Sequence, residues 1–82
     1  MKKQMYKLEI VWWNACKDIV LCSSSTMALM IVRDLFDYQD LTDILIYDLD
    51  GNYQYLKQNG NATYYYQNLI REERGGLKNG II

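Results

Sequence analysis

The chain has 82 residues, half of them apolar, and a formal net charge of −1. At this length one domain covering residues 1–82 is expected, with a core that supplies only a few kcal/mol of net stability, so a homodimer is compatible with its size. The sequence contains no histidine, which removes the commonest general base and the commonest partner of a nucleophilic Ser or Cys, excludes hydrolytic triads and predicts a protein that is not an enzyme.

Residues 5–13 alternate between two sets of side chains, which is the pattern of a strand with one buried side. Tyr6, Leu8, Ile10 and Trp12 share one face, and Lys7, Glu9, Val11 and Trp13 share the other. Residues 14–17 offer a turn, and residues 19–22 form a short β-rich run. The two segments therefore predict a first hairpin.

A helix is predicted over residues 25–38. Four consecutive hydroxyl residues, 23–26, supply candidate N-caps. Apolar residues then recur at steps of three and four, at positions 28, 31, 32, 35 and 36. The segment is therefore amphipathic.

A second hairpin is predicted from residues 44–49 and 52–57, which flank Asp50-Gly51. Asp-Gly between two β-rich runs favours a two-residue type I′ turn, because that turn needs positive φ at both central positions. In this register Ile44 and Ile46 share a face with Lys57 and Tyr55.

The segment after Asn59-Gly60 has two interpretations. The chain could continue as a strand meander through Tyr64–Tyr66, since tyrosine favours strands. We favour a helix over residues 64–74, capped by Asn61 and ended by Gly75-Gly76, with a flexible tail over residues 75–82. The resulting fold class is α+β, in the order ββαββα, with a four-stranded antiparallel sheet packed on one or two helices.

No metal site or cofactor is predicted. Asp48 to Asn52 matches half of a calcium loop, but the pattern places Ile46 at the first ligand position and Lys57 where a glutamate is required. The two cysteines, Cys16 and Cys22, have no metal or redox spacing and are expected as reduced thiols. The longest uncharged run, 19–32, is too short to span a membrane, no signal-peptide core follows the N-terminus, and we expect a cytoplasmic protein.

The charge distribution is uneven along the chain. Residues 1–33 carry a net charge of +3 and residues 51–82 carry +2, whereas residues 34–50 carry six aspartates and no base. An ordinary solvated surface explains such a run, because turns and helix ends are normal places for aspartate. A second interpretation is a negative surface that mimics a nucleic-acid backbone and binds a basic protein partner.

The aromatic content adds a second candidate surface. Eight tyrosines and two tryptophans bring more contact area than so small a core can bury. Trp13 is either covered by the C-terminal segment or exposed at an interface, where Tyr and Trp are enriched. The predicted partner-binding residues are therefore Asp34, Asp37, Asp40, Asp43, Asp48, Tyr53, Tyr55 and Trp13.

In size, acidity and lack of enzymatic groups the chain resembles the small inhibitors encoded by bacteriophages and mobile elements, including anti-CRISPR proteins. This resemblance implies a protein partner, such as a nucleic-acid-binding protein. A direct nucleic-acid ligand is not expected, because the six uncompensated aspartates would repel phosphates. The alternative is a small nucleic-acid-binding module that uses exposed aromatics and its basic termini.

Overall fold

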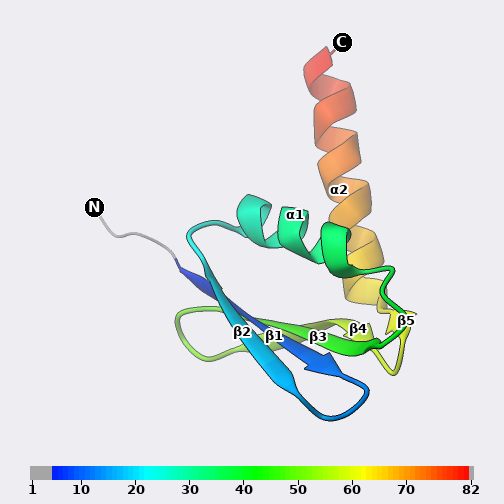
Figure 1. Cartoon of the computed structure of the whole chain (residues 1–82). Coiled ribbons are helices and arrows are strands. Elements are labelled where there is room, and N and C mark those ends of the chain that lie inside the picture. Colours follow the sequence, from blue (N-terminus) through cyan, green and yellow to red (C-terminus); the bar gives the residue numbers. More distant parts are fainter. Residues whose placement is uncertain (1–4, 82) are drawn as a thin grey trace.

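A computed structural model describes residues 5–81 of the chain, with the side chains of residues 5–72. The elements follow the order ββαβββα (Figure 1). They are β1 (Tyr6–Trp12), β2 (Lys17–Cys22), α1 (Ser25–Leu35), β3 (Leu41–Tyr47), β4 (Tyr53–Gln58), β5 (Asn61–Ala62) and α2 (Tyr64–Ile81).

The strands form one antiparallel sheet in the order β2-β1-β3-β4-β5. The α+β class is confirmed, but the described sheet has five strands where the sequence predicted four. The fifth strand arises because Asn59 and Gly60 both take positive φ, 51° and 82°. That turn brings Asn61 and Ala62 back against Gln58 and Lys57.

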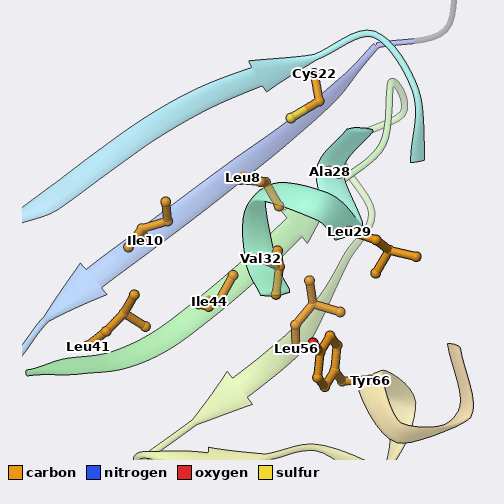
Figure 2. Packing of buried hydrophobic residues seen from close by; sticks show 10 residues of the cluster. All are labelled: Leu8, Ile10, Cys22, Ala28, Leu29, Val32, Leu41, Ile44, Leu56 and Tyr66. Atoms are coloured by element: carbon orange, nitrogen blue, oxygen red, sulfur yellow. The ribbon is translucent and has the colours of Figure 1, made fainter. Parts of the chain in front are cut away.

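Both helices cover the same face of the sheet, and the opposite face is left open (Figure 1). The core lies between the sheet and the helices, and its buried residues come from both layers (Figure 2). The alternation predicted for residues 5–13 is confirmed, because Leu8 and Ile10 are buried in this core. The core residues are Leu8, Ile10, Cys22, Ala28, Leu29, Val32, Leu41, Ile44, Leu56 and Tyr66.

Helix α1 starts where the hydroxyl run predicted. Ser24 is the N-cap, and its side chain accepts a hydrogen bond from the Met27 amide at 3.1 Å. The helix ends at Leu35, three residues before the predicted end. Tyr38 donates its amide to the Leu35 carbonyl, a tight turn that leads the chain into β3.

The β3–β4 hairpin differs from the predicted type I′ turn. Gly51 has positive φ, whereas Asp50 does not, and the Gly51 amide bonds to the Asp48 carbonyl at 3.2 Å. This is the three-residue loop in which a glycine follows a tight turn. Tyr47 therefore lies opposite Tyr53 and Leu45 opposite Tyr55, so the predicted pairing of Tyr55 with Ile46 on one face was wrong.

A bulge restores the predicted register farther from the turn. The ladder shifts between Ile44 and Leu45, so Ile44 lies opposite Lys57 as predicted, with Leu56 as the extra residue. Leu56 and Lys57 are both buried against the helices.

The C-terminal helix is confirmed, and the strand meander through Tyr64–Tyr66 is wrong. The N-cap of this helix, α2, is Thr63 and not Asn61, because the Thr63 hydroxyl accepts a hydrogen bond from the Tyr66 amide at 3.2 Å. The first turns of α2 pack on the sheet, and Tyr66 stacks on Phe36 with ring centroids 4.5 Å apart. The helix continues past Gly75-Gly76 to Ile81, so the predicted stop was wrong. The flexibility of residues 75–82 stays a prediction.

Candidate functional site

The open face of the sheet, on the side away from the helices, is defined by the strand register. Opposite residues in antiparallel strands share a face, so the ladder builds rows of side chains across four strands. The first row is Leu21, Lys7, Tyr47 and Tyr53; the second is Ile19, Glu9, Leu45 and Tyr55; the third is Lys17, Val11 and Asp43.

Three large side chains on this open face are exposed to solvent. Ile19, Leu21 and Tyr53 have exposed fractions of 52%, 61% and 53%. Leu45, in the middle of the face, is only 6% exposed. The open face therefore carries aliphatic side chains at the β2 side and tyrosines at the β3–β4 side, with Lys7 and Glu9 of β1 between them.

The tyrosines of the open face are arranged by contacts with one another. The Tyr47 and Tyr53 rings lie 5.4 Å apart and tilted, and the Tyr53 and Tyr55 rings lie 6.1 Å apart edge to face. These are favoured geometries for aromatic pairs. The three rings therefore need little ordering before they contact another surface.

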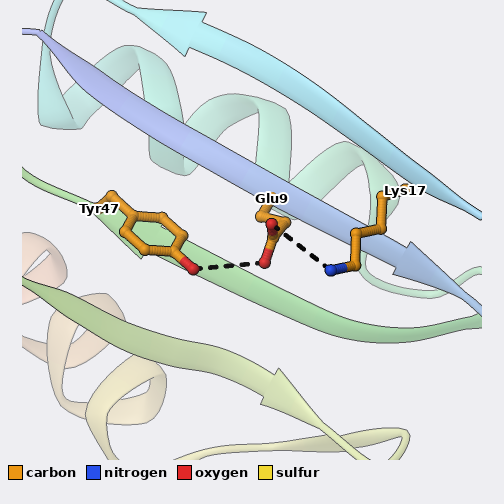
Figure 3. A network of polar contacts seen from close by, with 3 residues as sticks. All are labelled: Glu9, Lys17 and Tyr47. Carbon is orange, nitrogen blue, oxygen red and sulfur yellow. Dashed lines mark hydrogen bonds and ion pairs between the residues drawn. The ribbon is translucent and has the colours of Figure 1, made fainter. Parts of the chain in front are cut away.

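The charged groups of the open face are matched by neighbours (Figure 3). Lys17 Nζ lies 3.9 Å from a Glu9 oxygen, and the Tyr47 hydroxyl donates to the other Glu9 oxygen at 3.4 Å. Lys7 Nζ lies 4.4 Å above the Tyr47 ring. Burial of the Tyr47 ring, followed by the nearby Glu9 carboxylate and its hydrogen bond, raises the pKa of the Tyr47 hydroxyl.

The predicted acidic surface is divided in the structure. Asp34, Asp37 and Asp40 are exposed at the end of α1 and in the connection to β3, while Asp48 and Asp50 lie in the β3–β4 turn. The seven residues of β3 separate the two groups, a length of roughly 20 Å for an extended strand. The run therefore forms two smaller acidic groups at opposite ends of one strand.

Two of the predicted aspartates have structural hydrogen bonds. Asp43 lies in β3 rather than in the connection, and one of its oxygens accepts the Asn59 amide at 2.8 Å. Asp48 accepts the amides of Asp50 and Asn52 at 2.9 and 3.0 Å. Both carboxylates thus stabilise turns, which is a common use of aspartate.

Trp13 lies at the acidic end of α1. It is 71% exposed, so the covered alternative was wrong. Its amide donates to the Asp40 carbonyl at 2.7 Å, which joins the β1–β2 turn to the segment before β3. Nearby, Trp12, Asp37, Tyr38, Gln39 and Asp40 line a shallow hollow. Trp13 therefore belongs with Asp37 and Asp40, whereas Tyr53 and Tyr55 belong to the open face.

Sequence reasoning missed Ile19, Leu21 and Tyr47 as members of an exposed surface. A strand pattern alone does not show which of two faces the helices cover. The available signal was the first strand, because Lys7 and Glu9 mark its polar face and the hairpin register then places Leu21 and Ile19 beside them.

The remaining candidate chemistry is sparse in residues 5–72. Cys16 is exposed and Cys22 is buried, both as thiols, and burial raises the pKa of Cys22, which makes it a poor nucleophile. These residues contain no group of three metal-binding side chains. No helix within residues 5–81 is long and apolar enough to cross a membrane.

Comparison with protein-family models, with curated proteins and with solved structures finds no match for this chain.

Proposed function

We propose that this chain is a non-enzymatic protein-binding module that binds a protein partner on the open face of its sheet. The observation that supports the proposal is the exposure of Ile19, Leu21 and Tyr53 on a face whose charges are already matched. Exposed aliphatic side chains and tyrosines are typical of an interface centre, and the charged residues that share this face contact neighbours within the chain. Its predicted cytoplasmic location stays a prediction.

The chemistry of the open face also indicates the kind of partner. A charged group brought directly against Ile19 or Leu21 would lose water to an aliphatic surface, and it would gain little from the neighbouring Glu9 and Lys7, which already contact Lys17 and the Tyr47 ring. The partner surface that fits is therefore apolar where it contacts Ile19, Leu21 and the tyrosines. Tyr53 and Tyr55 would contribute area with little loss of side-chain freedom.

The alternative of a nucleic-acid-binding module is less well supported. Phosphate binding needs accessible cations, and on the open face Lys7 lies over the Tyr47 ring while the exposed Lys17 has the Glu9 carboxylate beside it, which would repel a phosphate. A fluorescence anisotropy titration with single-stranded and duplex oligonucleotides tests this alternative. Salt-sensitive binding below about 1 µM would favour nucleic-acid binding over the open-face proposal.

A second candidate surface is the acidic end of α1, defined by Asp34, Asp37, Asp40 and Trp13. For this surface we keep the hypothesis that the chain is a small inhibitor, of the phage or mobile-element kind. In that hypothesis the aspartates mimic a nucleic-acid backbone and bind a basic partner. The specific observation in its favour is the hollow beside Asp37 and Asp40, where the Trp12 and Tyr38 rings lie 6.2 Å apart. Aromatic rings next to carboxylates suit a lysine or arginine side chain.

Site-directed photo-cross-linking in native cells tests the open-face proposal. A photoreactive amino acid replaces Tyr53 in one variant, and Met30 in the control variant. Met30 is 62% exposed on α1, on the side of the molecule opposite the open face. We expect a discrete protein adduct from position 53 and none of the same mass from position 30. Equal adducts from both positions, or adducts from position 30 alone, would contradict the proposal.

A further inference from the structure

The two sides of the sheet differ in how far the main-chain groups of their outer strands are paired. At the β4 edge, β5 pairs with Lys57 and Gln58, and Thr63 bonds to the carbonyls of Tyr55 and Leu56 at 2.6 and 3.1 Å. At the other edge, β2 pairs with β1 alone among the described strands. The fold therefore covers the second half of β4 at one edge, whereas along the whole of β2 at the other edge the outer main-chain groups have no partner strand among the described residues.

Strand β2 also lacks the features that protect exposed edges. Proteins commonly protect such edges with proline, a bulge or a charge in the middle of the strand. The chain has no proline, and the β1–β2 ladder has no register shift. The two charged residues of β2 are its first two, Lys17 and Asp18. The centre of the strand, Ile19 to Leu21, is therefore uncharged.

We propose that two copies of this chain pair through β2 in antiparallel register about a two-fold axis. With Val20 opposite Val20 of the second copy, Ile19 of each copy lies opposite Leu21 of the other, on the open face. Asp18 then lies opposite Cys22, and Lys17 lies opposite Ser23, the residue that follows β2. Every pair at the centre is apolar, and such cross-strand pairs stabilise a sheet.

The charge pattern of β2 selects this antiparallel arrangement. A parallel pairing in register would place Lys17 beside Lys17 and Asp18 beside Asp18, and like charges side by side are unfavourable. The antiparallel arrangement moves the charged ends of the two strands to opposite ends of the seam. The symmetry is also the commonest among oligomers of identical chains, which use the same surface twice.

The contact across the seam consists mainly of main-chain hydrogen bonds. Five residues of each β2, 18–22, pair with one another in this register and give about four to six main-chain hydrogen bonds across the seam, which is at the low end of the usual range for protein interfaces. Ile19 and Leu21, which are 52% and 61% exposed in one copy, would become partly covered by their counterparts. The dimer therefore reduces the exposed apolar surface at the β2 edge.

Pairing through β2 also extends the open face across both copies. One open face of four strands measures roughly 20 by 20 Å, or about 400 Å² in projection. This is small against the roughly 800 Å² that each partner contributes to a standard-size interface. The joined faces would approach that size. This consequence rests on the proposed function, whereas the dimer itself does not.

Sedimentation equilibrium of the purified chain, without any partner, tests the dimer and leaves the proposed function untouched. We expect a mass of twice 9.7 kDa at about 100 µM, a concentration at which a dimer with a Kd of 10 µM or tighter is largely formed. Two double variants then test the register. Ile19→Lys with Leu21→Lys places four like charges at the seam, and we expect the Kd to rise at least tenfold. Ile19→Lys with Leu21→Glu places opposite charges across the seam, and we expect a Kd close to that of the unmodified chain.

The control double variant is Met27→Lys with Met30→Lys on α1, at positions exposed to a similar degree, 44% and 62%. We expect it to dimerise normally, and circular dichroism confirms that each variant is folded. A monomer at 100 µM, equal weakening by both β2 variants, or weakening by the α1 control would overturn the proposal.

Discussion

Lys57 and Phe36 are joined by a hydrogen bond that fixes the end of α1 to β4. Lys57 is 4% exposed, and its Nζ donates to the Phe36 carbonyl at 2.7 Å and to the Tyr38 carbonyl at 3.2 Å. The ammonium also lies 5.1 Å from the centre of the Phe36 ring. A buried charge is tolerated here because main-chain carbonyls and an aromatic face replace its water.

We therefore predict that Lys57→Met lowers the free energy of unfolding by about 1–3 kcal/mol, because it removes the donor that both carbonyls use. Urea unfolding measures the change. Lys17→Met is the control, since Lys17 is exposed and its contact with Glu9 is 3.9 Å long; we expect less than about 0.5 kcal/mol there. Equal losses in the two variants would show that the Lys57 contacts add no stability.

Lys57 also illustrates what the sequence could not predict. The pairing of Ile44 with Lys57 follows from the hairpin pattern and is confirmed. The burial of Lys57 depends on carbonyls at the end of α1, about 20 residues away in sequence, and no local pattern encodes their position. Strand β1 shows the opposite case, because its alternation is local and correctly predicted a strand whose side chains divide between two faces, one of them buried.

The turn after β3 was mispredicted for a different reason, which is local. Asp-Gly favours a two-residue turn, but the Asp48 carboxylate accepts the amides of Asp50 and Asn52 and so stabilises a longer loop. The acidic site was also mispredicted as one continuous surface. The aspartates are close in sequence, but β3 separates them into two groups at its opposite ends.

We predict that Asp48→Ala destabilises the fold by about 1–2 kcal/mol, because two loop amides lose their acceptor. Asp37→Ala, at an exposed position after α1, should cost less than about 0.5 kcal/mol. Thermal unfolding followed by circular dichroism compares the two. A larger loss for Asp37 than for Asp48 would contradict the assigned roles.

The acidic end of α1 is tested by changing Asp34, Asp37 and Asp40 together to Asn. Asp43 is left unchanged because it accepts the Asn59 amide. We expect stability within about 0.5 kcal/mol of the unmodified chain and, with a basic partner, slower association whose salt dependence is reduced. Surface plasmon resonance at several salt concentrations measures this. An unchanged association rate would return these aspartates to an ordinary solvated surface.

We predict that ionisation of Tyr47 lowers the free energy of unfolding of the chain in alkali. Its pKa is raised above the ordinary value of 10.0 in the folded chain, so above pH 10 the folded state retains a proton that the unfolded state releases. Stability from this group is complete below the unfolded pKa and falls as pH rises through the folded pKa. Urea unfolding at pH 9 and pH 11 should show a smaller loss for Tyr47→Phe than for the unmodified chain. An identical loss would show that Tyr47 does not contribute.

The most direct test of the open face as a binding surface is the affinity of the cross-linked partner for two matched variants. Tyr53→Ser and Met30→Ser remove side chains that are 53% and 62% exposed, on the open face away from the β2 edge and on α1. Truncating an aromatic side chain at an interface centre costs about 2 kcal/mol or more, so the Kd should rise roughly 30-fold or more for Tyr53→Ser and stay within about twofold for Met30→Ser. Equal affinities for both variants, measured by titration calorimetry, would contradict the open face as the binding surface.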